Sequence, residues 1–214
     1  MHMNPLKIIR RRVVAITIFS TLLPAAHSSG LDLLAKAVSG LASAAHANAS
    51  VEQVPTSGTI EVAFSPNEGA LELVLKVINS ARSEVRVMAY SFTSAPVSKA
   101  LIAAQKRGVA VKLVVDHKSN MGEDRSGKAR SALAALANAG VDVRTIDAYA
   151  IAHDKVIIVD AKTVQTGSFN YSASAVSRNS ENVLVNWGNQ ALAQAYMRHF
   201  ERNYRQSRKL NLGY

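Results

Sequence analysis

The sequence of 214 residues contains no cysteine. This absence excludes disulfide bonds, a thiol nucleophile and a cysteine metal site. It is compatible with an oxidising compartment but does not establish one. Any reaction that the protein carries out must therefore use other side chains.

Metal-binding patterns are also scarce. The three histidines that follow residue 49 are widely separated, and no His-x-x-x-His pair or carboxylate cluster has the spacing of a zinc site. Asp154 and Asp160 could in principle hold magnesium, but Lys155 lies between them and disfavours it. We therefore expect no metal and no other cofactor.

Long apolar runs are missing as well. Val13–Leu23 is apolar but too short for an ordinary membrane span. It follows a basic start that includes Arg10–Arg12 and precedes a stretch of small residues, which is the layout of a secretory signal. Ala47-Asn48-Ala49 is a candidate cleavage site, and an earlier cut near residues 26–28 is the alternative.

This layout divides the chain into an N-terminal segment and one folded domain. We predict residues 1–49 to be a signal peptide or an N-terminal anchor or extension, and residues 50–214 to be a single folded domain. The expected location is the periplasm or the outside of the cell, with an uncleaved membrane anchor as the alternative. The membrane would be a partner only in that second case.

The positive charge belongs to the predicted domain too. The whole chain has 25 basic and 15 acidic residues, a net charge of +10. Residues 50–214 keep 20 basic and 14 acidic residues, a net charge of +6. A domain with this balance attracts polyanions, which favours a nucleic-acid partner.

Strand and helix patterns alternate along this domain. Helices are expected at 65–82, opened by a Ser65–Glu68 capping box, and at 95–107, 128–139 and 191–205. Strands are expected at 59–64, 84–90, 109–115, 141–146, 156–159, 163–166 and 181–187. The alternation predicts an α/β fold with a mixed, mostly parallel sheet and helices on both faces.

The most informative stretch is H-x-K-x4-D, from His153 to Asp160, followed by G-S-x-N from Gly167 to Asn170. His153 and Lys155 are two residues apart at the start of an apolar strand, so they point to the same face. An imidazole can attack phosphorus, and a neighbouring cation can hold the anionic oxygens. Ser168 and Asn170 can supply donors to the same oxygens.

This constellation resembles the HKD motif of the phospholipase D superfamily. It is most similar to the small bacterial endonucleases that carry one motif per chain, because the G-S-x-N spacing is shorter than that of many longer members. The resemblance extends from about residue 58 to residue 204 and implies an α-β-α sandwich. The positions that match are His153, Lys155, Asp160, Gly167, Ser168, Asn170 and Glu181.

The resemblance also implies a mechanism. His153 would form a phosphohistidine, and Lys155, Ser168 and Asn170 would stabilise the phosphate oxygens. Glu181 would orient His153, whereas Asp160 would be structural. A second histidine must protonate the leaving oxygen, and a chain with one motif would obtain it as a homodimer whose two His153 residues face each other.

Residues outside the motif give weaker signals. Lys118, Arg125 and Lys128 lie in a polar segment after the strand at 109–115 and could contact nucleic acid. An ordinary solvated loop explains them equally well. We interpret His117 and His199 as surface residues.

Three functions remain open at this point. The first is an endonuclease that hydrolyses DNA with little sequence preference, with RNA as a further candidate. The second is a phospholipase or phospholipid transferase, since the same chemistry cleaves lipid head groups. The third is a catalytically silent nucleic-acid-binding module, although the intact H-x-K pattern argues against it.

Overall fold

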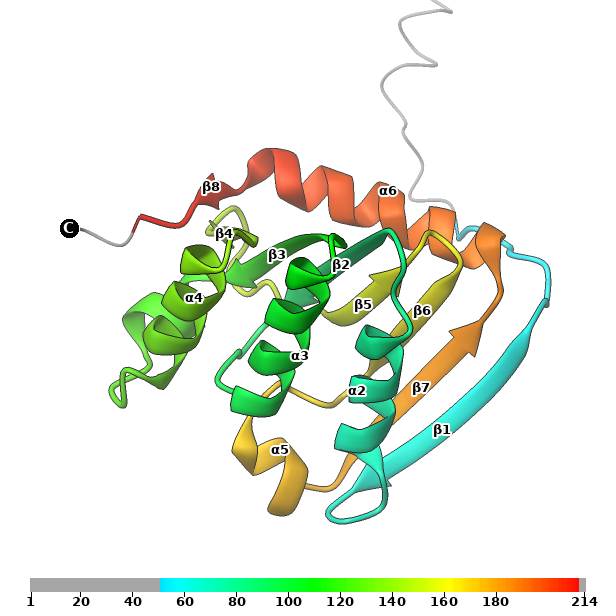
Figure 1. Ribbon diagram of the computed structural model, residues 1–214, viewed down its shortest axis with the longest axis horizontal. Helices are drawn as coiled ribbons and strands as arrows, with labels where there is room; N and C mark the ends of the chain where they lie inside the picture. The colour runs from blue at the N-terminus through cyan, green and yellow to red at the C-terminus, as the bar shows by residue number, and fades with distance from the viewer. Residues whose placement is uncertain (1–50, 212–214) are drawn as a thin grey trace, which may run out of the picture. The chain divides into compact units, whose positions relative to one another are not determined.

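A computed structural model describes residues 51–211 (Figure 1). The predicted signal peptide or anchor lies outside these residues. Residues 52–211 form one compact unit around an eight-stranded sheet in the order β1-β7-β6-β5-β2-β3-β4-β8. The strands are β1 (Thr59–Ser65), β2 (Glu84–Ala89), β3 (Ala110–Asp116), β4 (Asp142–Ile146), β5 (Lys155–Val159), β6 (Thr163–Gly167), β7 (Glu181–Trp187) and β8 (Arg208–Lys209).

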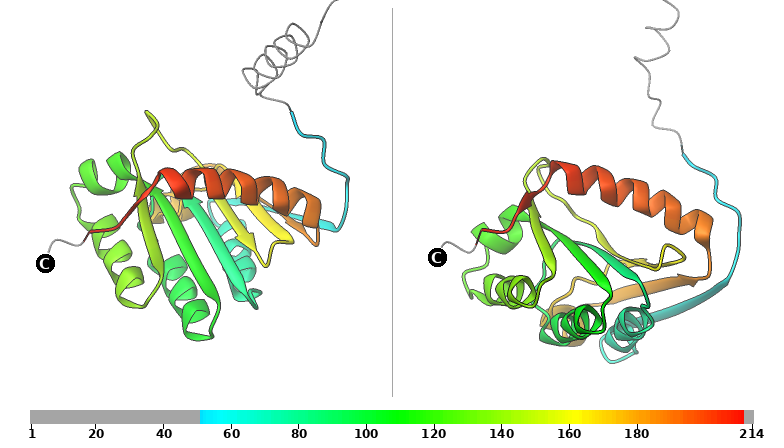
Figure 2. Two further views of the ribbon diagram at one scale, coloured as in Figure 1. Left: turned by 90° about the horizontal axis from the view of Figure 1, so that it is seen from above. Right: turned by 45° about the horizontal axis from the view of Figure 1, so that its top comes forward.

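Helices cover the sheet on both sides. They are α2 (Ala70–Asn79), α3 (Ala95–Lys106), α4 (Lys128–Asn138), α5 (Ala173–Ser177) and α6 (Gln190–Gln206), and a π-helical turn spans Lys118–Gly122. Helix α6 packs on one face, and α2, α3 and α4 pack on the other (Figure 2). None of the helices within residues 51–211 has both the length and the apolar character needed to cross a bilayer.

The expected α/β class is confirmed, but the expected predominance of parallel strands is wrong. Only the β2–β3 and β3–β4 pairs are parallel, and the other five pairings are antiparallel. A parallel pair needs a long crossover connection, usually a helix. Such helices connect the strands only as far as β4, whereas β5 and β6 are joined by a short turn and therefore pair antiparallel.

The continuous apolar run of β5 reflects burial on both sides. Val156 and Ile158 point into the core under α6, while Ile157 and Val159 point into the core under the other helices. All five residues of β5 are buried. A central strand with two covered faces has no solvent side, which explains why the sequence shows no polar alternation there.

The predicted capping box is wrong, although the helix that it was expected to open exists. Ser65 is the last residue of β1, where it pairs with Glu181 and its hydroxyl donates to the Asn179 carbonyl. The chain turns before helix α2 begins at Ala70, and Gly69 precedes it in a left-handed conformation. Ser65 is thus engaged by the sheet and cannot cap the helix.

The motif residues lie at the ends of neighbouring strands, at one edge of the sheet. Ala89, the last residue of β2, pairs with Lys155, the first residue of β5. Because β6 runs antiparallel to β5 and to β7, the end of β6 lies near the starts of both. His153, Gly167–Asn170 and Glu181 therefore meet at this edge.

Candidate active site

His153, Lys155 and Tyr90 form a contact cluster at the amino end of β5. The His153 and Tyr90 ring centroids are 4.6 Å apart, and Lys155 Nζ lies 5.2 Å from the centroid of the same tyrosine ring. Lys155 Nζ also donates a 2.8 Å hydrogen bond to the His153 carbonyl. The imidazole and the ammonium thus lie side by side, as the two-residue spacing predicted, and Tyr90 is a third member that the sequence pattern did not reveal.

The two motif residues differ in their exposure to solvent. His153 is exposed, whereas only 6% of Lys155 is accessible. Burial lowers the pKa of Lys155 below its ordinary value, and the charges of Asp154 and Glu181 oppose this shift. A reachable imidazole beside a partly desolvated cation suits attack on an anionic phosphate, because the cation acts in a medium that screens it weakly.

The G-S-x-N segment presents an amide that has no partner in the described chain. Asn170 Oδ1 is buried and makes no hydrogen bond there. The Nδ2 group of the same amide also makes no hydrogen bond within residues 51–211. Nδ2 is the donor of this side chain, so it is the atom that could bind a substrate oxygen.

Gly167 has a packing role between β6 and β7. Its φ is +147°, and a Cβ added there would lie 2.2 Å from the Asn182 carbonyl oxygen. Only glycine allows β6 to approach β7 this closely. The close approach lets the Ser168 amide donate to the Asn182 carbonyl at 3.1 Å.

Glu181 and Ser168 are bound to each other. The Ser168 hydroxyl donates to Glu181 Oε2 at 2.6 Å and accepts from the Asn182 amide at 3.1 Å. Glu181 Oε1 accepts from Asn179 at 2.9 Å. The carboxylate thus holds Ser168 in this structure, and its expected hydrogen bond with His153 stays a prediction.

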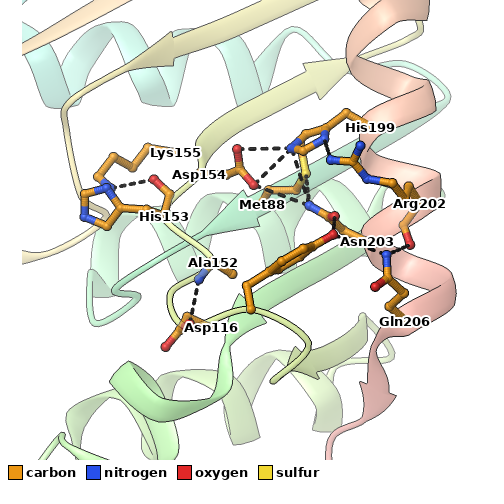
Figure 3. A network of polar contacts seen from close by, with 11 residues as sticks. Met88, Asp116, Ala152, His153, Asp154, Lys155, His199, Arg202, Asn203 and Gln206 are labelled. Carbon is orange, nitrogen blue, oxygen red and sulfur yellow. Dashed lines mark hydrogen bonds and ion pairs between the residues drawn. The ribbon is translucent and has the colours of Figure 1, made fainter. Parts of the chain in front are cut away.

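A polar network behind the motif joins it to α6 (Figure 3). Asp154 accepts hydrogen bonds from His199 Nε2 at 3.1 Å and from Asn203 at 3.3 Å. Arg202 lies 2.7 Å from His199 Nδ1, and since arginine can only donate, this nitrogen accepts and Nε2 carries the proton. His199 keeps 32% of its side chain exposed, as its interpretation as a surface residue predicted, but α6 also brings its ring against the motif across 45 residues of sequence.

Two further side chains hold the segments around His153. Asn120 accepts from the Phe92 amide at 2.9 Å and donates to the carbonyls of Tyr90 and Asp116. Asp116 accepts from the Ala152 amide at 2.9 Å. The π-helical turn thereby fixes Tyr90, and the end of β3 fixes the residue before His153. Both Asn120 and Asp116 are buried, which the sequence alone did not reveal.

Comparison with known families gives the decisive match. The family described as "Cardiolipin synthase, PLD-like domain" matches residues 74–204, which is more than half of the chain and includes the whole cluster at the amino end of β5. The chain belongs to the phospholipase D-like family. Membership supports a phosphodiesterase that hydrolyses ester bonds.

Relatives of this phospholipase D-like protein have several names. A phospholipase D of Rickettsia conorii is 37% identical over 141 residues, covering 66% of this chain and 67% of the relative. A mitochondrial cardiolipin hydrolase of Mus musculus is 31% identical over 119 residues, covering 56% of this chain and 51% of the relative. The chain thus spans about half the length of the latter protein.

Solved structures agree with the fold. Nuc from Salmonella typhimurium, a phospholipase D family member, is 43% identical, covers 72% of this chain and 98% of its own, and has a TM-score of 0.68. NucT from Helicobacter pylori is 22% identical with a TM-score of 0.61, covering 71% of this chain and all of its own. At that identity the second likeness supports the fold alone.

Asp160, the aspartate of this phospholipase D-like motif, has a structural position, as the resemblance implied. Asp160 lies at the opposite end of β5 from His153, and its carboxylate accepts from the amides of Arg82, Ser83 and Glu84. Burial alone would raise the pKa of Asp160, but these hydrogen bonds together lower it below its ordinary value.

Lys118, Arg125 and Lys128 were predicted as possible nucleic-acid contacts. Their surroundings differ. Lys118 forms an ion pair with Glu123 at 3.4 Å. Arg125 is exposed, and Lys128 lines a hollow between α3 and α4.

Within residues 51–211 no group of three or more His, Asp or Glu side chains could hold a metal ion.

Proposed function

We propose that this phosphodiesterase is a non-specific endonuclease that hydrolyses DNA, with RNA as a second substrate to be tested. The observation that carries the proposal is the exposed His153 ring, which lies beside the Lys155 ammonium and on the same sheet edge as the unpartnered Asn170 amide. The net charge of +6 on residues 50–214 supports nucleic acid as the phosphodiester.

The reaction follows from the chemistry of these groups. His153 attacks phosphorus in line, the bond to the leaving oxygen breaks, and an acid gives that oxygen a proton. Water then attacks the phosphohistidine, loses its proton to the same group, and releases His153. Lys155 and Asn170 stabilise charge on the non-bridging oxygens throughout. Ser168 could join them once its hydroxyl leaves Glu181.

The acid is the His153 of a second protomer in this proposal. Within residues 51–211, neither other histidine contacts His153: His117 bonds to Thr145, and His199 bonds to Asp154. Figure 3 shows the rings of His153 and His199 on opposite sides of Asp154. A two-fold axis beside the exposed His153 would supply the missing group.

The proposed location is the periplasm or the outside of the cell. It depends on residues 1–49, whose basic start, short apolar run and small residues fit a secretory signal. Comparing the size and the amino terminus of the protein from the periplasm with those of the whole chain tests it. Recovery of the full-length chain in the membrane fraction would favour the anchored alternative.

A phospholipid phosphodiesterase or transferase is the second candidate. The similarity to a phospholipase D and to a cardiolipin hydrolase favours it. The same histidine chemistry would act on a lipid head group, so the active-site geometry alone does not separate the two substrates.

A direct comparison of substrates tests the proposal. Purified protein is incubated with plasmid DNA and, in parallel, with phosphatidylcholine vesicles, each with excess EDTA. We expect cleavage of DNA and little release of choline. Cleavage of the lipid alone would favour the second candidate, turnover of neither would favour a binding module, and activity that requires added magnesium or zinc would contradict the metal-independent mechanism.

The shared site has its own test. Wild-type chains and His153→Ala chains are co-expressed at known ratios, and their mixing is verified. If each site uses one His153 from each protomer, activity per total protein follows roughly the square of the wild-type fraction. A linear dependence in chains shown to mix would mean that each chain carries a complete site, with His117 as the next candidate for the acid.

A further inference from the structure

An open groove lies on the face of the sheet that α2, α3 and α4 cover. It consists of two hollows of about 450 and 420 Å³ that share Thr93, Ala95 and Lys128. One hollow lies between α3 and α4, and the other lies between the start of α3 and α5. We refer to both together as the α3–α4 groove.

The groove begins close to the catalytic cluster. Thr93 is three residues beyond Tyr90, and Ala173 is three residues beyond Asn170. Three residues span at most about 10 Å, so the mouth of the groove lies within that distance of both. The amides of Thr93 and Ser94 each donate to the Tyr171 carbonyl at 2.8 Å, which fixes the two sides of the mouth together.

The groove combines an apolar floor with positive charge. Ala95, Ile102 and Ala132 contribute to the floor, and Lys99 and Lys128 are exposed cations that line it. No carboxylate lines either hollow. Neither lysine forms an ion pair within residues 51–211, whereas Lys118 and Lys76 are paired with glutamates there.

We propose that the α3–α4 groove binds the part of a nucleic-acid strand that flanks the scissile phosphodiester. Lys99 and Lys128 contact its phosphates, and the sugars and bases lie on the apolar floor. This inference rests on the proposed nuclease function. It favours a polynucleotide over a lipid because phosphatidylcholine has one phosphate, which His153 would engage, whereas each further nucleotide offers another phosphate to a lysine.

The test compares the two lysines that line the groove with a third lysine at the far end of α3. Lys99→Ala, Lys128→Ala and their double variant are assayed on a long single-stranded oligonucleotide and on bis(p-nitrophenyl) phosphate, which cannot reach the groove. The control is Lys106→Ala, which removes the same charge from α3 about two turns farther from the site. All three side chains are exposed, so the folded state is expected to persist.

On the long substrate we expect the double variant to raise KM about tenfold with little change in kcat. The dependence of log(kcat/KM) on log salt should lose a slope of about 0.7 for each lysine, the value for phosphate contacts on single strands. Hydrolysis of bis(p-nitrophenyl) phosphate should remain at the wild-type rate, and Lys106→Ala should behave like wild type on both substrates.

A variant that fills the groove without changing its charge completes the test. Ala132→Trp should also raise KM on the long substrate and leave bis(p-nitrophenyl) phosphate unaffected. Lysine variants that match Lys106→Ala, or an Ala132→Trp variant with wild-type KM, would overturn the groove as a binding site. A wild-type protein that hydrolyses bis(p-nitrophenyl) phosphate but no nucleic acid would instead overturn the proposed function, and with it this inference.

Discussion

The two ends of β5 treat their polar groups in opposite ways. At the carboxyl end, the Asp160 carboxylate is surrounded by donors from residues 82–84. At the amino end, His153 is exposed and has only an aromatic contact for its ring, and the neighbouring Asn170 oxygen has no partner in the described chain. The polar groups at one end of β5 thus have hydrogen-bond partners, and the His153 ring and the Asn170 oxygen at the other end lack them within residues 51–211.

This difference separates stability from function. A buried polar group with all its hydrogen bonds made contributes to the folded state, and it has nothing left to offer a substrate. Buried polar groups without hydrogen-bond partners lower the stability of the folded state, and proteins keep them mainly at functional sites. We therefore expect substitutions at the amino end to affect turnover and substitutions at the carboxyl end to affect unfolding.

The largest effect on turnover is expected for His153→Ala. The nucleophile is lost, and kcat should fall by about 10⁴-fold or more. The unfolding temperature should stay near that of wild type because the ring is exposed. His117→Ala, an exposed histidine bonded to Thr145, is the matched control and should retain activity. Near wild-type rates for His153→Ala would show that another residue attacks phosphorus.

Lys155→Ala should follow with a loss of about 10²- to 10³-fold in kcat, as for removal of a group that stabilises transition-state charge. The comparison between the strand ends is sharpened by Lys162→Ala, since Lys162 is an exposed lysine just beyond the other end of β5. Steady-state rates on one DNA substrate measure both. Equal losses in the two variants would indicate a general charge effect instead of a role at the reacting phosphate.

Tyr90→Leu should reduce kcat about tenfold, because the ring contacts both His153 and Lys155 and aromatic contacts of this kind contribute about 0.5–1.5 kcal/mol. Tyr90→Phe keeps the ring and should remain near wild type. Rates of phosphohistidine formation in a single turnover measure the effect on the attacking step. A phenylalanine variant as slow as the leucine variant would assign the role to the hydroxyl.

A smaller loss, about threefold in kcat, is expected for His199→Phe, which removes a hydrogen bond worth about 0.5–1.5 kcal/mol to Asp154. His199→Gln can donate to the same carboxylate and should recover most of the rate. Because Asp154 lies between the two catalytic residues, KM should change little. If His199→Gln were as slow as His199→Phe, the hydrogen bond would not be sufficient, and the ring itself would be needed for packing.

Asp160→Asn should have the smallest effect on turnover and a clear effect on stability, of about 2 kcal/mol for hydrogen bonds to a charged group. Since the pKa of Asp160 is lowered in the folded state, its contribution is fully present above the unfolded pKa and is lost as pH falls through the folded pKa. Urea unfolding at neutral and at acidic pH should show a difference between variant and wild type that shrinks with acidification. A constant difference would exclude the ionised carboxylate as its source.

Local patterns in the sequence determined that His153 lies beside Lys155. The alternation of side chains along a strand has a fixed period, so His153 and Lys155 had to share a face once β5 was recognised. The apolar run of β5 and the glycine that ends α3 likewise located elements to within a residue or two. These features depend on neighbours in the chain, which the sequence displays directly.

Tertiary structure alone decided the partners across the chain. It brought His199 to Asp154 across 45 residues, Asn120 to Tyr90 across 30, and Ser168 to Glu181 across 13. It also made five of the seven strand pairings of residues 51–211 antiparallel, and it placed Lys99 and Lys128 in one groove. Such contacts depend on how whole elements pack, and that packing is a property of the summed core and not of any local period.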